Sequence, residues 1–486
     1  MKPPGFFTND HKHYPVLSAF LALAVATGLA AFAGHSQIML KGDAFFYTKM
    51  LRYLIYGEFH RVYTVWPAGF PALGLPFTAL GVYPGVSLFL VDLVCFAALI
   101  FLCDAYLLRH RFGPWERIAL LLALVALPVI WGSLFIPNSE LPFAISVFAI
   151  GYGLYRLPKT RGYIILSLAI AAGFLLRYIG IVFLAVFPIV FLMNRKSRNS
   201  PENRKLFTAA LFPVLVVVGY TSMNYLWTSD ITGAARKPAG FALIDSLSGF
   251  GTALSLALSP FIRGVFHDLV TAAIGIVLTA LLILLIIACW RSSRCPAFVR
   301  MLSIPTVLYS IGMILARSSV IYALDTPTRA IPVLPFVLLA GAAFLRQRKM
   351  LLFACTALMI VAGTAQCIKR ASWMDNNLPV RQAEAFLSAH AKAGDRILVN
   401  HAGRDIFRAT FNDVTFIDSG GLENPPRGYD YVFLLPYAYG KRKTYTFDAR
   451  IRACVRLGRL EQAGYTQIGK ADTYIVYAKK RGPRGM

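Results

Sequence analysis

Four charged residues at the edges of apolar runs have side chains that could carry out chemistry. Asp43 is the first acid after the first long apolar run, and Glu140, Arg177 and Arg329 stand beside later runs. A carboxylate at such a boundary can accept a proton as a general base. A guanidinium group can bind a phosphate through two parallel donors and stabilise charge in a dry site. These types make Asp43 a candidate base, Glu140 a candidate substrate contact, and Arg177 and Arg329 candidate phosphate contacts.

Each of these residues also has a structural explanation. Asp43 could cap the helix that starts there, and Glu140 could be an acid in the first turn of a helix capped by Ser139. Arg177 could extend its charged head from an apolar hairpin to the membrane surface, and Arg329 could be an ordinary residue of an outer loop. The positions of the four side chains relative to one another decide between these explanations.

Asp43 and Glu140 together also form the predicted metal site. Two carboxylates at the outer face suit Mg²⁺ or Mn²⁺, with waters completing the coordination shell. The seven cysteines show neither a CxxC motif nor zinc-ligand spacing, so we expect no structural metal and no disulfide framework. A divalent cation is therefore the only cofactor that the sequence predicts.

Two further acids lie within the second apolar run. Acids are costly inside a membrane, so Asp92 is either functional or held by a structural hydrogen bond. Asp104 lies close to Arg109 near the expected cytoplasmic end of the same run. We expect these last two residues to form an ion pair.

The segment that begins at Asp43 has the pattern of a helix lying in the membrane surface. Between residues 43 and 57, apolar residues recur at three-to-four spacing while the basic residues fall elsewhere. A turn rich in proline and glycine follows, and residues 69–81 form a second apolar piece that is too short to span a bilayer. We expect a pair of interfacial helices at 43–57 and 69–81, with Tyr47 and Trp66 contacting substrate.

The composition is that of a polytopic membrane protein. Of the 486 residues, 57% are apolar and 15% are charged, and the mean hydropathy is +0.59. About eleven apolar runs are compatible with spanning a bilayer. They are residues 15–33, 86–108, 117–133, 141–156, 163–176, 179–193, 206–226, 268–290, 301–316, 330–345 and 350–367.

The formal charge of +26 follows from membrane topology rather than from nucleic-acid binding. Lysine and arginine gather in the short segments between alternate runs, which is typical of cytoplasmic loops. This bias predicts a cytoplasmic N-terminus and three outer features, the loops 34–85 and 227–267 and the long tail. Residues 31–33, Ala-Phe-Ala, resemble a signal-peptide cleavage site, but an uncleaved first span is favoured. With either alternative Asp43 lies outside, and we expect no nucleic-acid partner.

The tail changes composition after residue 370. Strand-like segments alternate with helix-like ones, which indicates a small α/β domain over residues 371–486. It contains no GxGxxG and no Walker loop, so no nucleotide site is predicted. We expect an extracytoplasmic domain that handles the acceptor or serves as a cap.

Several segments together resemble one known family along residues 15–370. An acid opens the stretch GDAFFYTKMLRYLIYGEF, a proline-rich turn follows in VWPAGFPALGLPFTALG, and a second acid lies in IPNSELPF. LLRYIG and DTPTRAIPVLP supply the later arginines. In order, spacing and membrane side these segments are similar to the GT-C type glycosyltransferases that use polyprenol-phosphate sugars. That family includes protein O-mannosyltransferases and the lipid A aminoarabinose transferase.

The resemblance implies an α-helical, GT-C-like membrane domain over residues 1–370 and an inverting hexosyl- or pentosyltransferase. The donor would be a polyprenyl-phosphate sugar, and the acceptor a glycolipid, polysaccharide or protein on the outer face of the plasma (inner) membrane. Because phosphate is a good leaving group, one carboxylate suffices as base, unlike the pair used on ordinary glycosidic bonds. This is the role that Asp43 would fill.

Two other classes of protein are alternatives. A transporter or flippase for lipid-linked sugars would be expected to show related halves and acids paired in mid-membrane, and the sequence has no internal repeat. A non-catalytic envelope assembly protein would tolerate the loss of Asp43. The sequence therefore favours the transferase.

Overall fold

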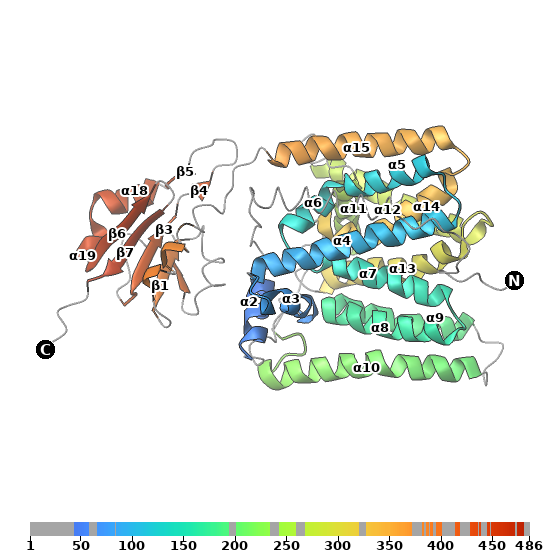
Figure 1. Ribbon diagram of the computed structural model, residues 1–486, viewed down its shortest axis with the longest axis horizontal. Coiled ribbons are helices and arrows are strands. Elements are labelled where there is room, and N and C mark those ends of the chain that lie inside the picture. The colour runs from blue at the N-terminus through green and yellow to red at the C-terminus, as the bar shows by residue number, and fades with distance from the viewer. Residues whose placement is uncertain are drawn as a thin grey trace.

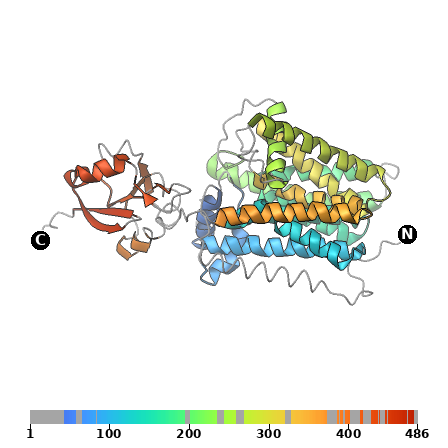
Figure 2. The ribbon, with the colours of Figure 1, turned by 90° about the horizontal axis from the view of Figure 1, so that it is seen from above.

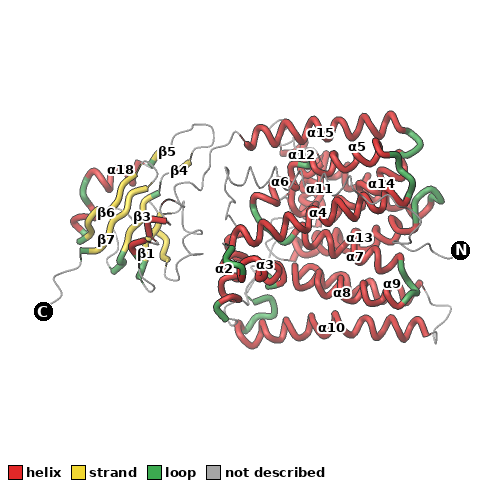
Figure 3. Tube along the Cα trace, viewed as in Figure 1, coloured by secondary structure: helices red, strands yellow, loops and turns green. Residues whose placement is uncertain are grey.

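The computed structural model has two parts, a bundle of helices and a small domain built on a sheet (Figure 1; Figure 3). The first predicted span, residues 15–33, lies outside the described residues. The structure describes residues 43–57, 66–82, 84–193, 201–233, 243–258, 268–319, 327–371, 382, 385–387, 389–391, 395–400, 414–417, 428–435, 437–438, 445–447, 449–471 and 474–480.

Apolar helices form the bundle, and most of them run along the longest axis of the molecule (Figure 2). Their residues are apolar on several sides because they face either a neighbouring helix or lipid. In chain order they are α4 (Pro84–Arg109), α5 (Pro114–Val125), α6 (Pro128–Phe135), α7 (Glu140–Tyr155), α8 (Thr160–Leu176), η2 (Tyr178–Ala185), α9 (Val186–Met193), α10 (Pro201–Thr228), α12 (Asp268–Arg291), α13 (Ala297–Ser319), η4 (Pro327–Val333), α14 (Leu334–Leu345) and α15 (Lys349–Ala371).

Every predicted apolar run after the first coincides with described helices. Within the described residues, five helical segments are long and apolar enough to cross a bilayer, namely 84–109, 201–228, 273–291, 297–318 and 327–345. The run 117–133 is divided into α5 and α6 at Pro128, because proline has no backbone N–H to continue the helix. The protein is therefore a multi-pass membrane protein, and the number of crossings stays a prediction.

One buried helix replaces part of a predicted outer loop. The loop assignment of residues 227–267 is wrong for α11 (Leu243–Leu258), which packs against α12, α13 and η4. A Cβ placed on Gly251 would lie 2.1 Å from the carbonyl oxygen of Gly275, so the two backbones touch. α11 has 16 residues, which are too few for a typical membrane span. Its small residues instead permit close packing against other helices.

The two short helices after the first run are α2 (Asp43–Ile55) and α3 (Gly69–Ala79), close to their predicted bounds. They lie across one end of the bundle (Figure 1). The ring of Tyr47 meets Phe70 edge-on at 5.0 Å, which joins the two helices. A Cβ on Gly69 would lie 2.4 Å from the carbonyl oxygen of Leu175, so α3 is pressed against the end of α8. The first residue of α2 is thereby brought to the end of the bundle.

The C-terminal part contains a five-stranded sheet in the order β2-β1-β3-β7-β6. The strands are β1 (Ile397–Asn400), β2 (Val414–Ile417), β3 (Tyr431–Leu434), β6 (Tyr465–Ala471) and β7 (Tyr474–Lys479). The pairs β1–β2 and β1–β3 are parallel, and β3–β7 and β6–β7 are antiparallel.

Apolar residues cover both faces of this sheet. Ile397 and Val399 enter one apolar cluster while Leu398 enters the other, as expected when side chains alternate along a strand. The second cluster also takes in residues of α18 (Ala449–Arg456) and α19 (Arg459–Gln462). The strands β1, β2, β3 and β7 fall within the predicted strand-like segments 395–400, 414–418, 429–436 and 473–479, and β6 begins with the predicted segment 465–469 and extends two residues beyond it. The location of this domain outside the cytoplasm stays a prediction.

Candidate functional site

Asp43 lies in the first turn of α2, and its side chain is 31% exposed. Its Oδ2 atom accepts a hydrogen bond from Nη2 of Arg329 at 3.3 Å. The carboxylate is thus reachable from outside the protein and also linked to a cation in the bundle. This contact goes beyond a helix-capping role.

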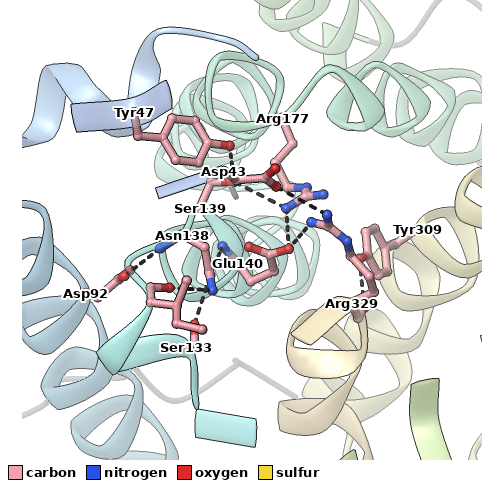
Figure 4. A network of polar contacts seen from close by, with 11 residues as sticks. Asp43, Tyr47, Asp92, Ser133, Asn138, Ser139, Glu140, Arg177, Tyr309 and Arg329 are labelled. Carbon is pink, nitrogen blue, oxygen red and sulfur yellow. Dashed lines mark hydrogen bonds and ion pairs between the residues drawn. The ribbon is translucent and has the colours of Figure 1, made fainter. Parts of the chain in front are cut away.

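Glu140 is the first residue of α7 and is only 1% exposed. Its Oε1 atom accepts from Nη1 of Arg177 at 2.6 Å and also from Nη1 of Arg329. Burying a carboxylate is costly unless it is paired, and here one oxygen is shared by two cations. Glu140 therefore holds the two guanidinium groups side by side (Figure 4).

The two arginines come from breaks in regular helix. Arg177 is an extended residue (φ −152°, ψ 131°) between α8 and η2, and its side chain is 9% exposed, so it turns inward rather than to the membrane surface. Arg329 lies in η4, where Pro327 and Pro332 restrict the backbone, and its side chain is 10% exposed. The hydroxyl of Tyr309 in α13 donates to the carbonyl oxygen of Arg329 at 2.8 Å, which fixes this turn.

A second chain of contacts joins α2 to Arg177. The hydroxyls of Tyr47 and Ser139 are hydrogen-bonded at 3.0 Å, and Nη1 of Arg177 donates to Oγ of Ser139 at 3.2 Å. Ser139 thus uses its hydroxyl across the site and makes no capping bond within α7. Burial raises the pKa of Tyr47 above its usual range, so its phenol stays protonated.

Together these contacts link six side chains in a row whose two ends, Asp43 and Tyr47, both lie on α2. The backbone of α2 joins the two ends, and the set is hereafter called the charged ring. Because residues from α2, α7, the α8–η2 break and η4 all contribute, the ring can form only when these four elements are packed together (Figure 4). Its members, in order, are Asp43, Tyr47, Ser139, Arg177, Glu140 and Arg329.

A set of buried polar residues supports the start of α7. The backbone N–H of Asn138 donates to Oδ2 of Asp92 at 3.0 Å. The side-chain oxygen of Asn138 accepts from the hydroxyl of Ser133 at 2.8 Å and from the backbone N–H of Glu140 at 3.1 Å. Asp92 therefore makes a structural hydrogen bond that orients the turn before Glu140. This is the structural one of the two roles predicted for Asp92.

The structure brings five of the six predicted site residues into the charged ring. Trp66, the sixth, stacks on Phe46 with ring centroids 4.5 Å apart and planes 13° from parallel. Phe46 lies on α2 one turn after Asp43, so Trp66 adjoins the ring through this aromatic pair. From the sequence Ser139 was expected only as a helix cap, and Ser133, Asn138 and Tyr309 were not predicted, because neutral polar residues in apolar surroundings carry no local signal of function.

One predicted ion pair has a different partner. Asp104 was expected to pair with Arg109, but both of its oxygens accept from Arg117 of α5, at 2.7 and 2.9 Å. The cause is that α4 and α5 pack side by side, so the next helix presents its cation to Asp104. A guanidinium can meet both carboxylate oxygens only when it approaches from such a facing element.

The predicted divalent cation fits these residues poorly. Arg329 contacts both Asp43 and Glu140, so a guanidinium already lies between the two proposed ligands. Among the described residues no group of three or more His, Cys, Asp or Glu side chains could hold a metal ion. The predicted ion stays a prediction, and no step proposed below depends on it.

The charges of the ring balance as two carboxylates and two guanidiniums. Three of the four are deeply buried, whereas Asp43 is the exposed member. Guanidinium groups held in advance in a dry site favour developing negative charge on a phosphate. A neighbouring exposed carboxylate can accept a proton from a substrate that reaches this end of the bundle.

Comparison with known proteins gives a weak match to solved structures. No family model matches the chain, and no curated protein matches it. ArnT from Cupriavidus metallidurans bound to undecaprenyl phosphate aligns with a TM-score of 0.43 and 12% identity, over 95% of this chain and 97% of that chain. The same protein in the apo state aligns with a TM-score of 0.41 and 11% identity, over 95% and 98%.

At this level of similarity the alignment does not by itself establish a shared fold or a shared activity.

Proposed function

We propose that this protein is an inverting glycosyltransferase that moves a sugar from a polyprenyl-phosphate donor to an acceptor on the outer face of the plasma membrane. The observation that carries the proposal is a partly exposed carboxylate, Asp43, next to two buried guanidiniums, Arg329 and Arg177, at one end of an apolar bundle. A lipid-linked donor can reach such a site with its isoprenoid chain in the bilayer and its phosphate at the arginines.

The reaction is a single displacement. The acceptor hydroxyl attacks the anomeric carbon, its proton passes to Asp43, and the bond between that carbon and the phosphate oxygen breaks. The electron pair of the broken bond leaves with the polyprenyl phosphate. Arg177 and Arg329 stabilise the charge that gathers on this phosphate. Attack from the face opposite the leaving group inverts the anomeric configuration.

Glu140 has a positioning role in this scheme. Its single Oε1 atom contacts both guanidiniums, so it keeps two like charges together and directs their remaining N–H groups. Donor phosphate competes with Asp43 for Arg329. Binding of the donor would then release the carboxylate of Asp43 from Arg329, so that it can face the acceptor hydroxyl.

Neighbouring residues complete the proposed site. The stacked Phe46 and Trp66 offer an apolar surface beside Asp43 on which a sugar or acceptor ring could pack. In the proposed orientation the C-terminal domain lies on the same side of the membrane as this site. It would then handle the acceptor, which could be a glycolipid, a polysaccharide or a protein.

A lipid analysis tests the donor class directly. Mass spectrometry of lipids that co-purify with the protein should find a polyprenol carrying a phosphate and a sugar. The purified protein should then release polyprenyl phosphate from that lipid when an acceptor is added. Movement of the intact lipid-linked sugar from one leaflet of a vesicle membrane to the other, with no release of polyprenyl phosphate, would instead support a transporter or flippase.

A further inference from the structure

A groove lies between α8 and α10, two helices that pack side by side (Figure 1). Its volume is about 420 Å³, and it is separate from the charged ring. The groove begins at Thr160, the first residue of α8, whereas Arg177 follows the last residue of that helix. At about 1.5 Å per residue the two ends of α8 are roughly 25 Å apart.

The lining of the groove changes from cationic to apolar along both helices. Arg204 and Lys205, both exposed, lie at its start together with the hydroxyl of Thr160. Further along, Ile164, Leu168 and Phe212 supply exposed apolar walls. The lining residues of each helix repeat at three-to-four spacing over two turns, so the groove follows the helix axes for roughly 12 Å.

This gradient matches the chemistry of one kind of molecule. A lipid with an anionic head group would place its phosphate near the two cations and an acyl chain along the apolar walls. Both helices begin at this end, so their positive dipole ends add to the attraction for an anion. The nearest acid on α10, Glu202, does not line the groove but the adjoining cavity, and Tyr163 lies between the two and lines both.

We propose that the groove between α8 and α10 binds an anionic glycerophospholipid of the cytoplasmic leaflet. The proposal rests on the cytoplasmic placement of this end of the bundle and is independent of the proposed transferase activity. Charge complementarity selects the occupant, because a zwitterionic lipid offers no net charge to Arg204 and Lys205. A helix from another protein would leave these two cations without a phosphate partner.

The contribution of the cations can be estimated. A Lys or Arg near an anionic lipid surface strengthens binding by about fivefold, so two of them contribute about 30-fold. Arg204→Gln/Lys205→Gln should therefore weaken phosphatidylglycerol binding by about that factor. Ala209→Trp, which fills the groove from α10 and leaves both cations, should weaken it as well.

The experiment uses the full-length protein in detergent, titrated with phosphatidylglycerol or phosphatidylcholine and examined by native mass spectrometry. We expect the wild type to retain phosphatidylglycerol more tightly than phosphatidylcholine. Arg204→Gln/Lys205→Gln and Ala209→Trp should both lose this retention of phosphatidylglycerol. A photoactivatable phosphatidylglycerol should cross-link to peptides of α8 and α10. Arg291→Gln/Arg294→Gln removes two exposed cations outside the groove and should leave retention unchanged.

Three results would overturn the proposal. The first is equal retention of the two lipids by the wild type. The second is unchanged phosphatidylglycerol binding in Arg204→Gln/Lys205→Gln, or an equal loss in the control pair. The third is displacement of the lipid by millimolar inorganic phosphate, which would indicate a site for a free anion without an acyl chain.

Discussion

Arg329 and Glu140 are separated by 189 positions in the chain, yet they form an ion pair in which both side chains are almost completely buried. The same arginine reaches Asp43 on α2, and the same glutamate reaches Arg177. A buried pair of this kind contributes less to stability than to placing charge, because desolvation offsets much of the Coulomb attraction. The ion pair between Arg329 and Glu140 therefore helps to fix two guanidiniums beside the partly exposed carboxylate of Asp43.

Removing the charge of Glu140 should destabilise the protein. Glu140→Gln keeps the size of the side chain but leaves two buried guanidiniums without their common anion. Breaking a buried ion pair in this way typically costs about 3–5 kcal/mol, so thermal unfolding should occur at a clearly lower temperature. Glu202→Gln, a matched change in the first turn of α10, should leave the unfolding temperature close to that of the wild type.

Arg329 should not be replaceable by lysine. In Arg329→Lys a single ammonium group keeps the charge but cannot contact Asp43 and Glu140 through two separate nitrogens. We expect kcat/KM for the donor to fall by about 10- to 100-fold while the protein stays folded. Steady-state kinetics with varied donor provide the measurement, and wild-type kinetics in the lysine variant would show that only charge matters at this position.

The location of this site was predictable from sequence because charge is conspicuous in an apolar chain. Asp43, Glu140, Arg177 and Arg329 all stand at the boundaries of apolar runs, which marks them as candidates for a site at the membrane surface. The contacts among them were not predictable. They depend on which way each helix is rotated about its axis, and that is set by packing between segments far apart in the chain.

The same reasoning explains the two errors. Residues 243–258 are rich in serine, glycine and alanine, which dilutes their apolar character, so no apolar run was predicted there. Small residues nevertheless suit a buried helix that packs at close range. Asp104 was paired with its neighbour along the chain, whereas the structure pairs it with Arg117 across a helix contact. Proximity in sequence is a poor guide to partners once helices face one another.

Tyr47 should affect stability at alkaline pH. Its phenol is buried and its pKa is raised, so above about pH 10 the unfolded chain loses a proton that the folded protein keeps. Stability therefore falls as pH rises through that range. Tyr47→Phe should cost about 1 kcal/mol at neutral pH through the lost hydrogen bond to Ser139.

The measurement is chemical unfolding of wild type and Tyr47→Phe between neutral pH and pH 11. The difference in the free energy of unfolding between the wild type and Tyr47→Phe should become smaller as the pH rises. A difference in unfolding free energy that stays constant from neutral pH to pH 11 would show that ionisation of Tyr47 is not linked to folding.

Chelation tests whether Arg329 alone or a divalent cation bridges Asp43 and Glu140. Because Arg329 bridges these carboxylates, we expect sugar transfer to continue in excess chelator. The assay compares turnover before and after chelation, with added Mg²⁺ or Mn²⁺ as the control. Activity that is lost on chelation and restored by either ion would support a divalent cation at these residues.

The central claim is that Asp43 accepts the proton of the acceptor hydroxyl. Asp43→Asn keeps the size of the side chain and its ability to accept a hydrogen bond from Arg329, but it removes the basic carboxylate. Loss of a positioned base typically lowers the rate by about 10²- to 10⁴-fold. The variant should therefore bind the donor and yet transfer its sugar at a rate lower by that factor.

The decisive measurement compares sugar transfer from a polyprenyl-phosphate donor by wild type and Asp43→Asn, at equal expression and equal thermal stability. Glu202→Gln serves as the matched acid-to-amide control and should transfer sugar at the wild-type rate. A rate lowered by about 10²-fold or more in Asp43→Asn alone is the predicted result. A rate within about threefold of wild type would contradict the claim and leave Asp43 a structural partner of Arg329.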